Sequence, residues 1–154
     1  MIHAFLIIAH DNFPLLKRLL RRLDSPNSNI YIHIDKKLSL PMNYENELRF
    51  VVKFAKVVCI PRDKVTWGGY SLIQCTLNLL KTATKDCNDY YHLLSGHDYP
   101  LVGMKAFNEF FTANNGMEFI GFSRQSFADK EKQRYSVYYF FQDMVSKKKA
   151  FYGG

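Results

Sequence analysis

The sequence lacks most of the short motifs that reveal an enzyme class. It has no glycine-rich phosphate loop of the Walker or dinucleotide-binding type, and Gly68-Gly69 alone is a weak signal. It has no Gly-x-Ser-x-Gly turn of a serine hydrolase, because Ser95-Gly96 stands outside that context. It also has no Cys-x-x-Cys or His-x-x-x-His pair for zinc. These absences argue against Walker-type nucleotide hydrolysis, serine hydrolysis and a zinc site of local spacing.

Cysteines and long apolar runs are also scarce. The three cysteines, Cys59, Cys75 and Cys87, follow no disulfide or metal-binding pattern, which predicts reduced thiols and a cytoplasmic chain. No apolar run approaches the roughly 20 residues of a membrane span. Residues 1–9 are apolar but lack the basic leader and cleavage site of a signal peptide, so we expect a strand there.

Apolar and basic residues are abundant instead. Hydrophobic residues make up 47% of the 154 residues and aromatic residues 16%, which predicts a single packed domain and not a disordered chain. The net charge is +7, but the basic residues at 17–22 and 147–149 resemble no nucleic-acid module, so we expect no nucleic-acid partner. Residues 17–22 form the charged face of a predicted helix. We expect at most peripheral contact with the inner face of a membrane, which flotation with anionic vesicles would test.

Apolar runs and helically spaced leucines alternate along the chain. Strands are predicted at residues 3–9, 30–34, 56–60, 90–94 and 117–122, and helices at residues 15–23, 44–50, 71–84, 104–112 and 129–145. Asp11 or Asn12 is the expected cap of the first helix, and Pro14 lies in its first turn. Within 71–84 we expect five side chains to face inward: Leu72, Ile73, Leu77, Leu79 and Leu80. The alternation predicts an α/β fold with a mostly parallel sheet flanked by helices.

Polar side chains follow three of the predicted strands. His10 ends the first, Asp35 the second, and Ser95-Gly96-His97-Asp98 follows the apolar run 90–94, which reads as a buried strand. In open α/β sheets, ligands bind at this carboxyl edge. Asp35 could accept a hydrogen bond from a ribose hydroxyl or a uracil N–H, or could be a turn aspartate bonded to its own backbone. A lone histidine such as His10 is more often a structural donor than a catalyst. Asp98 is a single acid where a magnesium or manganese cage needs several oxygens, so we expect no metal site.

Four segments in order carry a resemblance to a known family. They are residues 5–10 (FLIIAH), 31–37 (YIHIDKK), 65–74 (VTWGGYSLIQ) and 93–101 (LLSGHDYPL). Together they resemble the Core-2/I-branching glycosyltransferases (glycosyltransferase family 14), which include β-1,6-N-acetylglucosaminyltransferases and peptide O-xylosyltransferases. The resemblance covers residues 2–122. It implies a GT-A-type fold, a UDP-sugar donor, a glycan or other hydroxyl acceptor, inversion at the anomeric carbon, and transfer without a metal or other cofactor.

The resemblance also implies roles for single residues. Asp35 would contact uracil and His10 would lie beside the nucleotide, while Trp67, Ser71, Ser95 and Asp98 would line the donor side. Glu118 resembles the acceptor-binding glutamate of the family. In the family, the catalytic base and the basic residues that bind the diphosphate lie well downstream of the loop that resembles residues 95–100, so they are expected beyond residue 154. Glu131 is a candidate for the base by residue type alone. The transferred sugar, N-acetylglucosamine or xylose, is not determined by these motifs.

The sequence therefore predicts one partial GT-A domain, with a nucleotide-binding core at residues 1–122 and a poorly defined tail at 123–154. Such a chain would hold donor recognition but not the base, and would suit a bacterial-type enzyme of surface polysaccharide synthesis. Two alternatives stay open: a noncatalytic nucleotide- or glycan-binding remnant, and an unrelated α/β protein with convergent motifs. The aromatic residues 138–141 (YYFF) also predict a tendency to self-associate if they are exposed.

Overall fold

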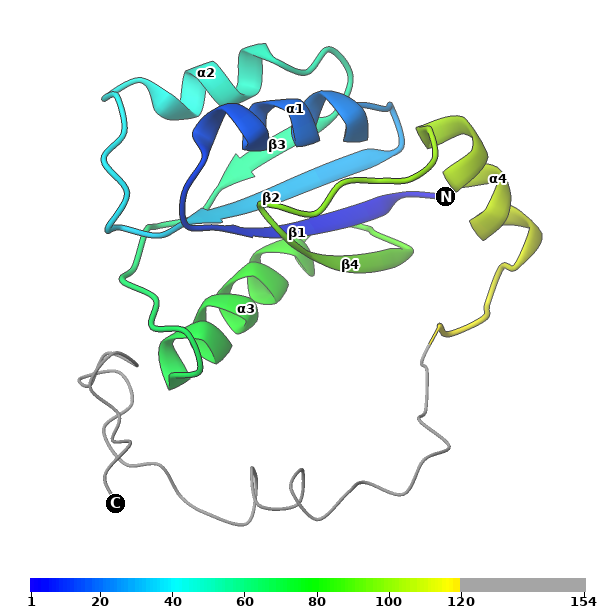
Figure 1. The fold of residues 1–154 in the computed structure, drawn as a ribbon. Coiled ribbons are helices and arrows are strands. Elements are labelled where there is room, and N and C mark those ends of the chain that lie inside the picture. Colours follow the sequence, from blue (N-terminus) through cyan, green and yellow to red (C-terminus); the bar gives the residue numbers. More distant parts are fainter. Residues whose placement is uncertain (120–154) are drawn as a thin grey trace, which may run out of the picture.

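The computed structural model describes residues 1–119, in which four strands alternate with four helices (Figure 1). In chain order these are β1 (His3–Ala9), α1 (Phe13–Leu23), β2 (Ser28–Ile34), α2 (Tyr44–Phe50), β3 (Lys56–Cys59), α3 (Tyr70–Ala83), β4 (Tyr90–Ser95) and α4 (Met104–Ala113). Every element predicted before residue 113 is present, and its bounds lie within two residues of the prediction.

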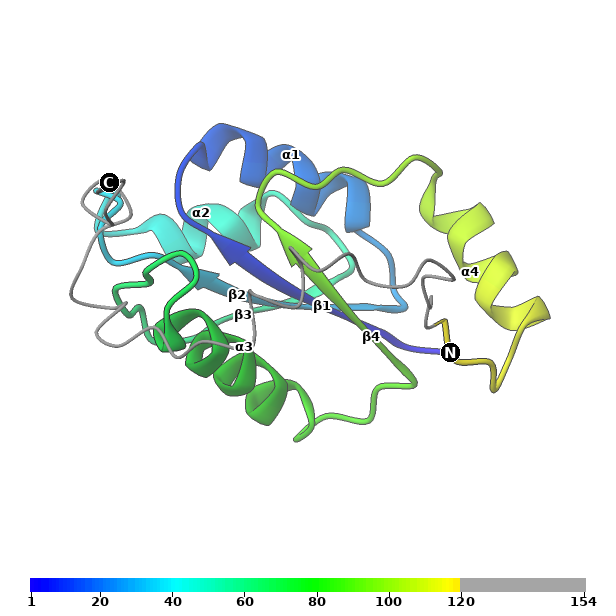
Figure 2. The same cartoon turned by 60° about the horizontal axis from the view of Figure 1, so that its bottom comes forward.

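The strands form one parallel sheet in the order β3-β2-β1-β4. Helices α1 and α2 cover one face of this sheet and α3 covers the other (Figures 1 and 2). The chain runs outward from β1 to β3 and then returns to the opposite side of β1, so the strand order reverses between β1 and β4. This is the topological switch point at which open α/β sheets bind their ligands. The predicted α/β fold with a parallel sheet is therefore confirmed.

Helix α1 follows its sequence signals closely. The side chain of Asn12 accepts a hydrogen bond from the backbone N–H of Leu15 at 3.2 Å, so Asn12, and not Asp11, is the cap. Asn12 has a φ of 45°, in the left-handed region that asparagine tolerates better than most residues. The buried residues of α1 are Leu16, Leu19, Leu20 and Leu23, and they pack on the sheet. This spacing leaves the basic side chains on the outer face.

Helix α3 corrects part of the predicted inward face. Leu79 is buried and Leu72 and Leu80 pack against the same cluster, but Ile73 is 56% exposed and Leu77 is 48% exposed. A helix buries one stripe of side chains spaced three or four residues apart, and here that stripe runs through Leu72, Cys75, Leu79 and Ala83. Ile73 and Leu77 lie beside this stripe and are exposed, so the prediction that they face inward is wrong.

Strand β4 is less buried than its apolar sequence predicts. It is an outer strand of the described sheet, and α3 packs on β1 and β2, so Leu93 is 57% exposed and Tyr91 is 40% exposed. The strand predicted at residues 90–94 is present, but the prediction that it is buried is wrong within the described residues.

The strand predicted at residues 117–122 is also not found in its described part. Residues 117–119 are not in a strand, because Gly116 at φ 82° turns the chain after α4. The N–H of Met117 then bonds the carbonyl of Asn114 at 3.1 Å. Residues 120–122, the helix predicted at 129–145 with Glu131, and the aromatic residues 138–141 lie outside the described residues.

Strands β1 and β4 approach each other closely where they end. The N–H of Gly96 donates to the carbonyl of Ile8 at 2.9 Å, and a Cβ on Gly96 would lie only 2.9 Å from Cβ of Ala9. Real Cβ atoms do not approach this closely, so glycine is required here because of space. The loops that follow the two strands are held side by side by this contact.

We expect Gly96→Ala to lower the free energy of unfolding by about 2 kcal/mol, because overpacking a tight contact costs this order of energy. Urea denaturation measures it. Ala9→Gly removes the methyl group that the new side chain would meet. Gly96→Ala should therefore cost less in the Ala9→Gly background than in the unaltered chain. Equal costs in both backgrounds would show that the close approach to Ala9 is not what excludes a side chain.

Candidate functional site

A pocket opens at the carboxyl ends of β1 and β2, on the face of the sheet that α3 covers. Its walls come from four segments that are distant in sequence. The lining residues are Ile8, Ala9, His10, Asp35, Lys37, Val65, Trp67 and Leu72. Three of the predicted site residues, His10, Asp35 and Trp67, therefore line one pocket. The strand pattern placed His10 and Asp35 at a common sheet edge, whereas Trp67 was expected there only from the family resemblance.

Asp35 supplies the buried charge of this pocket. Its side chain is 3% exposed, its Oδ1 accepts the backbone N–H of Lys37 at 2.9 Å, and its Oδ2 lies 3.1 Å from Nζ of Lys37. Nζ of Lys37 also donates to the carbonyl of Val65 at 2.6 Å. Asp35 is thus a turn aspartate bonded to its own backbone and also a carboxylate at a pocket wall. The two readings of Asp35 do not exclude each other.

Arg62 holds the turn that carries Asp35. Its guanidinium donates to the backbone carbonyls of Ile34 at 3.2 Å, Asp35 at 2.8 Å and Leu38, and it lies over the ring of Tyr44 at 5.5 Å. Three carbonyl acceptors on one rigid guanidinium restrict the backbone on both sides of Asp35. Sequence analysis missed Arg62, because nothing in its local sequence shows that it reaches a turn 24 to 28 residues earlier.

His33 attaches the segment beside Arg62 to the sheet. This side chain is buried in β2, and its Nε2 accepts the backbone N–H of Asp63 at 3.0 Å. Burial lowers the pKa of His33, which keeps the ring neutral and Nε2 able to accept. Cys75 lies on the same side of the sheet, and burial raises the pKa of its thiol to about 12. Cys75 is therefore not a nucleophile at neutral pH, and all three cysteines are free as predicted.

Trp67 and Ser71 lie at the start of α3 and have different surroundings. Trp67 is 71% exposed at the rim of the pocket. Ser71 lies in the first turn of α3, and its Oγ accepts the N–H of Thr66 at 2.8 Å. Gly69 precedes the helix. Ser71 is not among the pocket-lining residues and acts on the turn that carries Trp67.

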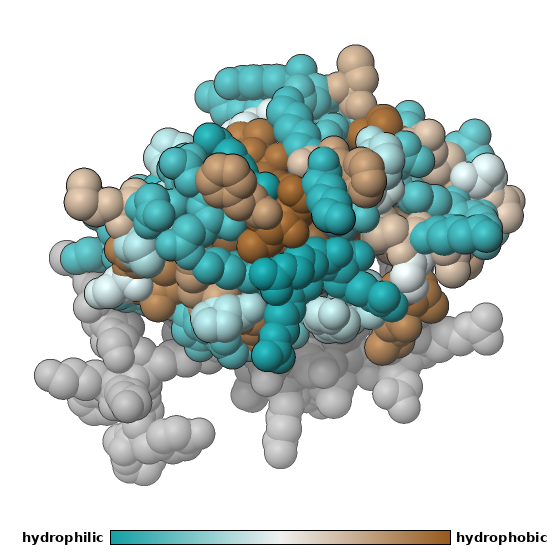
Figure 3. All heavy atoms as spheres, turned by 90° about the horizontal axis from the view of Figure 1, so that it is seen from above, coloured by the Kyte–Doolittle hydropathy of each residue, from teal (hydrophilic) through white to brown (hydrophobic). Residues whose placement is uncertain are grey.

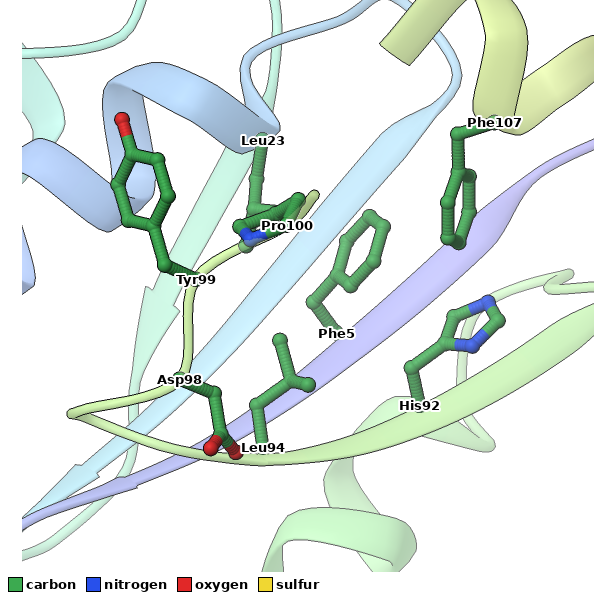
Figure 4. Close-up of a pocket in the computed structure, with 8 residues that line it drawn as sticks. All are labelled: Phe5, Leu23, His92, Leu94, Asp98, Tyr99, Pro100 and Phe107. Carbon is green, nitrogen blue, oxygen red and sulfur yellow. The ribbon is translucent and has the colours of Figure 1, made fainter. Parts of the chain in front are cut away.

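The loop after β4 is closed by its own hydrogen bonds. The N–H of Ser95 donates to Oδ2 of Asp98 at 2.7 Å, and the N–H of His97 donates to Oγ of Ser95 at 3.2 Å. Asp98 lines a second, mostly apolar pocket, in which its side chain lies beside Leu94 (Figure 4). That pocket also contains Phe5, which belongs to the apolar cluster beneath α1. Asp98 and Asp35 therefore line pockets on opposite faces of the sheet.

Comparison with known proteins identifies the kind of protein to which this arrangement belongs. A sequence model described as Branch, Core-2/I-Branching enzyme, matches residues 3–152. The chain belongs to the Core-2/I-branching enzyme family. The resemblance carried by the four sequence motifs is thereby confirmed, and the parallel sheet with helices on both faces is the GT-A-type fold expected of this family.

Three named relatives align with much of this chain. Xylosyltransferase sqv-6 of Caenorhabditis elegans is 29% identical over 130 residues, which are 78% of this chain and 16% of the worm protein. Xylosyltransferase oxt of Drosophila pseudoobscura pseudoobscura is 31% identical over 122 residues, 74% of this chain and 13% of the fly protein. The human probable beta-1,3-galactosyl-O-glycosyl-glycoprotein beta-1,6-N-acetylglucosaminyltransferase 7 is 28% identical over 102 residues, 64% of this chain and 23% of that protein. This Core-2/I-branching chain thus spans less than a quarter of each relative's length.

Glu118 is not brought to the pocket of this Core-2/I-branching chain. It is exposed and follows Met117, whose carbonyl accepts from the hydroxyl of Tyr90 at 3.3 Å. Tyr90 begins β4, so Glu118 lies toward the amino ends of the strands, whereas His10 and Asp35 lie at the carboxyl ends. Its acceptor-binding role stays a prediction from the resemblance.

The outer surface agrees with the predicted charged helix. Arg18, Arg21 and Arg22 of α1 are exposed. Seen from above, the face that includes α1 and α2 is mostly hydrophilic, with a hydrophobic area between hydrophilic side chains (Figure 3). Within residues 1–119, no helix combines the length and the apolar character needed to cross a bilayer. Peripheral contact with a membrane stays a prediction.

Proposed function

We propose that this chain carries the donor-binding part of an inverting glycosyltransferase that uses a UDP-sugar. The observation that carries the proposal is the pocket at the strand ends, where the buried carboxylate of Asp35 lies among apolar walls below the exposed ring of Trp67. Ligand pockets commonly combine apolar walls with a few fixed polar groups in this way. Family membership supports the reaction class.

Uracil suits this pocket chemically. The base is flat and apolar on both faces, which matches Ile8, Val65 and Leu72 along the wall, and its imide N–H can donate to a carboxylate. Asp35 has acceptor capacity beyond the two bonds that Lys37 donates to it. Lys37 contacts this carboxylate, and Arg62 holds the backbone carbonyl of the same residue, so a base that donates to Asp35 meets an organised acceptor.

The proposed reaction is a single displacement. A glutamate outside the described residues removes the proton of the acceptor hydroxyl as that oxygen attacks C1 of the sugar, and the C1–O bond to UDP breaks. Basic side chains stabilise the departing diphosphate without a metal ion. The donor sugar is N-acetylglucosamine or xylose, the sugars in the names of the relatives, and the acceptor is a glycan or another hydroxyl compound. The alternative is a noncatalytic module that binds nucleotide or glycan.

Calorimetric titration with UDP tests the proposal. We expect UDP to bind in EDTA and equally in manganese, and Asp35→Asn to weaken binding at least about tenfold, since it removes a charged acceptor. CDP is the matched ligand, because cytosine lacks the imide N–H. UDP should bind more tightly than CDP, and this preference should shrink in Asp35→Asn.

Three outcomes decide between the readings. Absence of UDP binding by a folded sample, or equal binding by Asp35→Asn, contradicts the assignment of the pocket. Binding with release of free UDP from a UDP-sugar and an acceptor supports the enzyme. Binding without any turnover supports the noncatalytic alternative.

A further inference from the structure

A cluster of two histidines and an aspartate lies at the switch point between β1 and β4. His10 and Asp11 follow β1, and His97 follows β4. One nitrogen of each ring and one carboxylate oxygen lie within 4.8 Å of one another. All three residues are exposed, and the cluster uses Asp11 and His97, which the donor pocket does not contain.

The three side chains already face one another. Nε2 of His97 lies 2.9 Å from Oδ1 of Asp11, and Nε2 of His10 lies 3.6 Å from Oδ2 of the same carboxylate. The two imidazole rings are 5.1 Å apart between centroids. A carboxylate between two imidazoles therefore presents two nitrogen ligands and an oxygen ligand toward a common space.

The backbone holds the two loops together independently of these side chains. Gly96 packs directly on Ala9, and residues 10 and 97 are the next residues along each chain segment. The chain has five histidines, and the three others are buried or half-buried, with His3, His33 and His92 all in strands. The two exposed histidines thus follow a close backbone contact, which holds their Cα atoms near each other.

We propose that His10, Asp11 and His97 bind zinc or a similar divalent transition metal. Imidazole nitrogen suits zinc, nickel, cobalt and copper, whereas magnesium and manganese prefer sites made of oxygen ligands. Two histidines and one carboxylate make a three-ligand site, which leaves one position of a tetrahedral zinc ion for water or an anion. The proposal departs from the expectation of no metal site, which was argued from Asp98 and from local spacing alone. The ligands come instead from two strand ends that are far apart in the sequence.

Zinc titration of the untagged chain by calorimetry tests the proposal, with cobalt absorption in the visible region as a second measurement. We expect one equivalent of zinc to bind with a dissociation constant in the micromolar range, and magnesium not to bind. His97→Ala and Asp11→Asn should each weaken zinc binding at least about tenfold, since each removes one of three ligands. Both positions are exposed, so circular dichroism should show an unchanged fold.

Glu109→Gln is the matched control, because this acid is exposed on α4 and paired only loosely with Lys105 at 4.0 Å. It should bind zinc as the unaltered chain does. Absence of zinc binding by the folded chain, unchanged binding by His97→Ala, or equal weakening by Glu109→Gln overturns the proposal. No nucleotide takes part in this experiment, so its failure would leave the proposed donor site untouched.

Discussion

Acidification from pH 7 to pH 4 is expected to lower the free energy of unfolding by about 3 kcal/mol through His92 alone. Burial, and after it the charge on the neighbouring His3, lower the pKa of His92 to about 4. An unfolded histidine has a pKa near 6.5, so the unfolded chain binds more protons than the folded chain between about pH 6.5 and pH 4. Stability is therefore fully present above pH 6.5 and is lost as the pH falls.

The cause is an aromatic cage that cannot hydrate a charged imidazole. The ring of His92 lies 5.1 Å from Phe5, 5.2 Å from Phe107 and 5.1 Å from Phe111, measured between centroids. Its Nε2 lies 3.1 Å from Nδ1 of His3, a distance at which one neutral ring donates to the other. Protonating both rings would place two positive charges side by side. Burial lowers the pKa of His3 as well, which adds to the loss in the same pH range.

Urea denaturation at pH 7, 5.5 and 4 measures this loss. His92→Phe is the informative variant, because a phenyl ring suits the cage and carries no charge at any pH. The variant should lose clearly less stability between pH 7 and pH 4, although His3 and His33 still contribute. An unchanged pH dependence in His92→Phe would show that the acid sensitivity arises elsewhere.

Asp24→Ala is expected to lower the free energy of unfolding by about 3 kcal/mol, as three charge-assisted hydrogen bonds are lost. Oδ2 of Asp24 accepts the backbone N–H of Lys53 at 2.7 Å, and Oδ1 accepts the N–H groups of Phe54 and Ala55 at 2.9 Å each. These donors lie in the segment between α2 and β3. The side chain of Asp24, at the end of α1, therefore holds this segment against α1 by three hydrogen bonds.

Asp24→Asn is the matched control for this prediction. Its amide oxygen can still accept from Phe54 and Ala55, whereas its amide group cannot accept from Lys53, so we expect an intermediate loss. Burial raises the pKa of Asp24, but the three backbone donors outweigh burial and the net pKa is lowered. The stabilisation should therefore persist down to about pH 4 and disappear only below it, outside the histidine range. Thermal or urea unfolding that finds Asp24→Ala as stable as the unaltered chain would contradict the proposed role.

Local signals predicted the elements well because each element depends on neighbouring residues. The apolar run 3–9, the cap at Asn12 and the leucine spacing of α1 each specify a backbone conformation within a few residues. The motifs also led to the correct edge of the sheet, since parallel strands that end in polar residues present them on one side. His10 and Asp35 meet there, and Trp67 lines the same pocket from the loop before α3.

Long-range contacts were not predictable in the same way. Arg62 donates hydrogen bonds to the turn at Asp35, and Gly96 contacts Ala9. Both contacts join residues that are distant in sequence. The exposure of Leu93 depends on which helix covers β4, and a run of apolar residues does not contain that information. Asp98 followed β4 as expected, yet it lines a pocket on the opposite face of the sheet from Asp35.

The sequence by itself determined the alternation of strands and helices, the family, and the polar residues that follow the strands, because these depend on local pattern and motif order. The tertiary structure alone decided which of those residues share a pocket, which face of α3 is buried, and that His10, Asp11 and His97 converge. Those outcomes depend on strand order and register, which set distances between segments that have no local pattern in common.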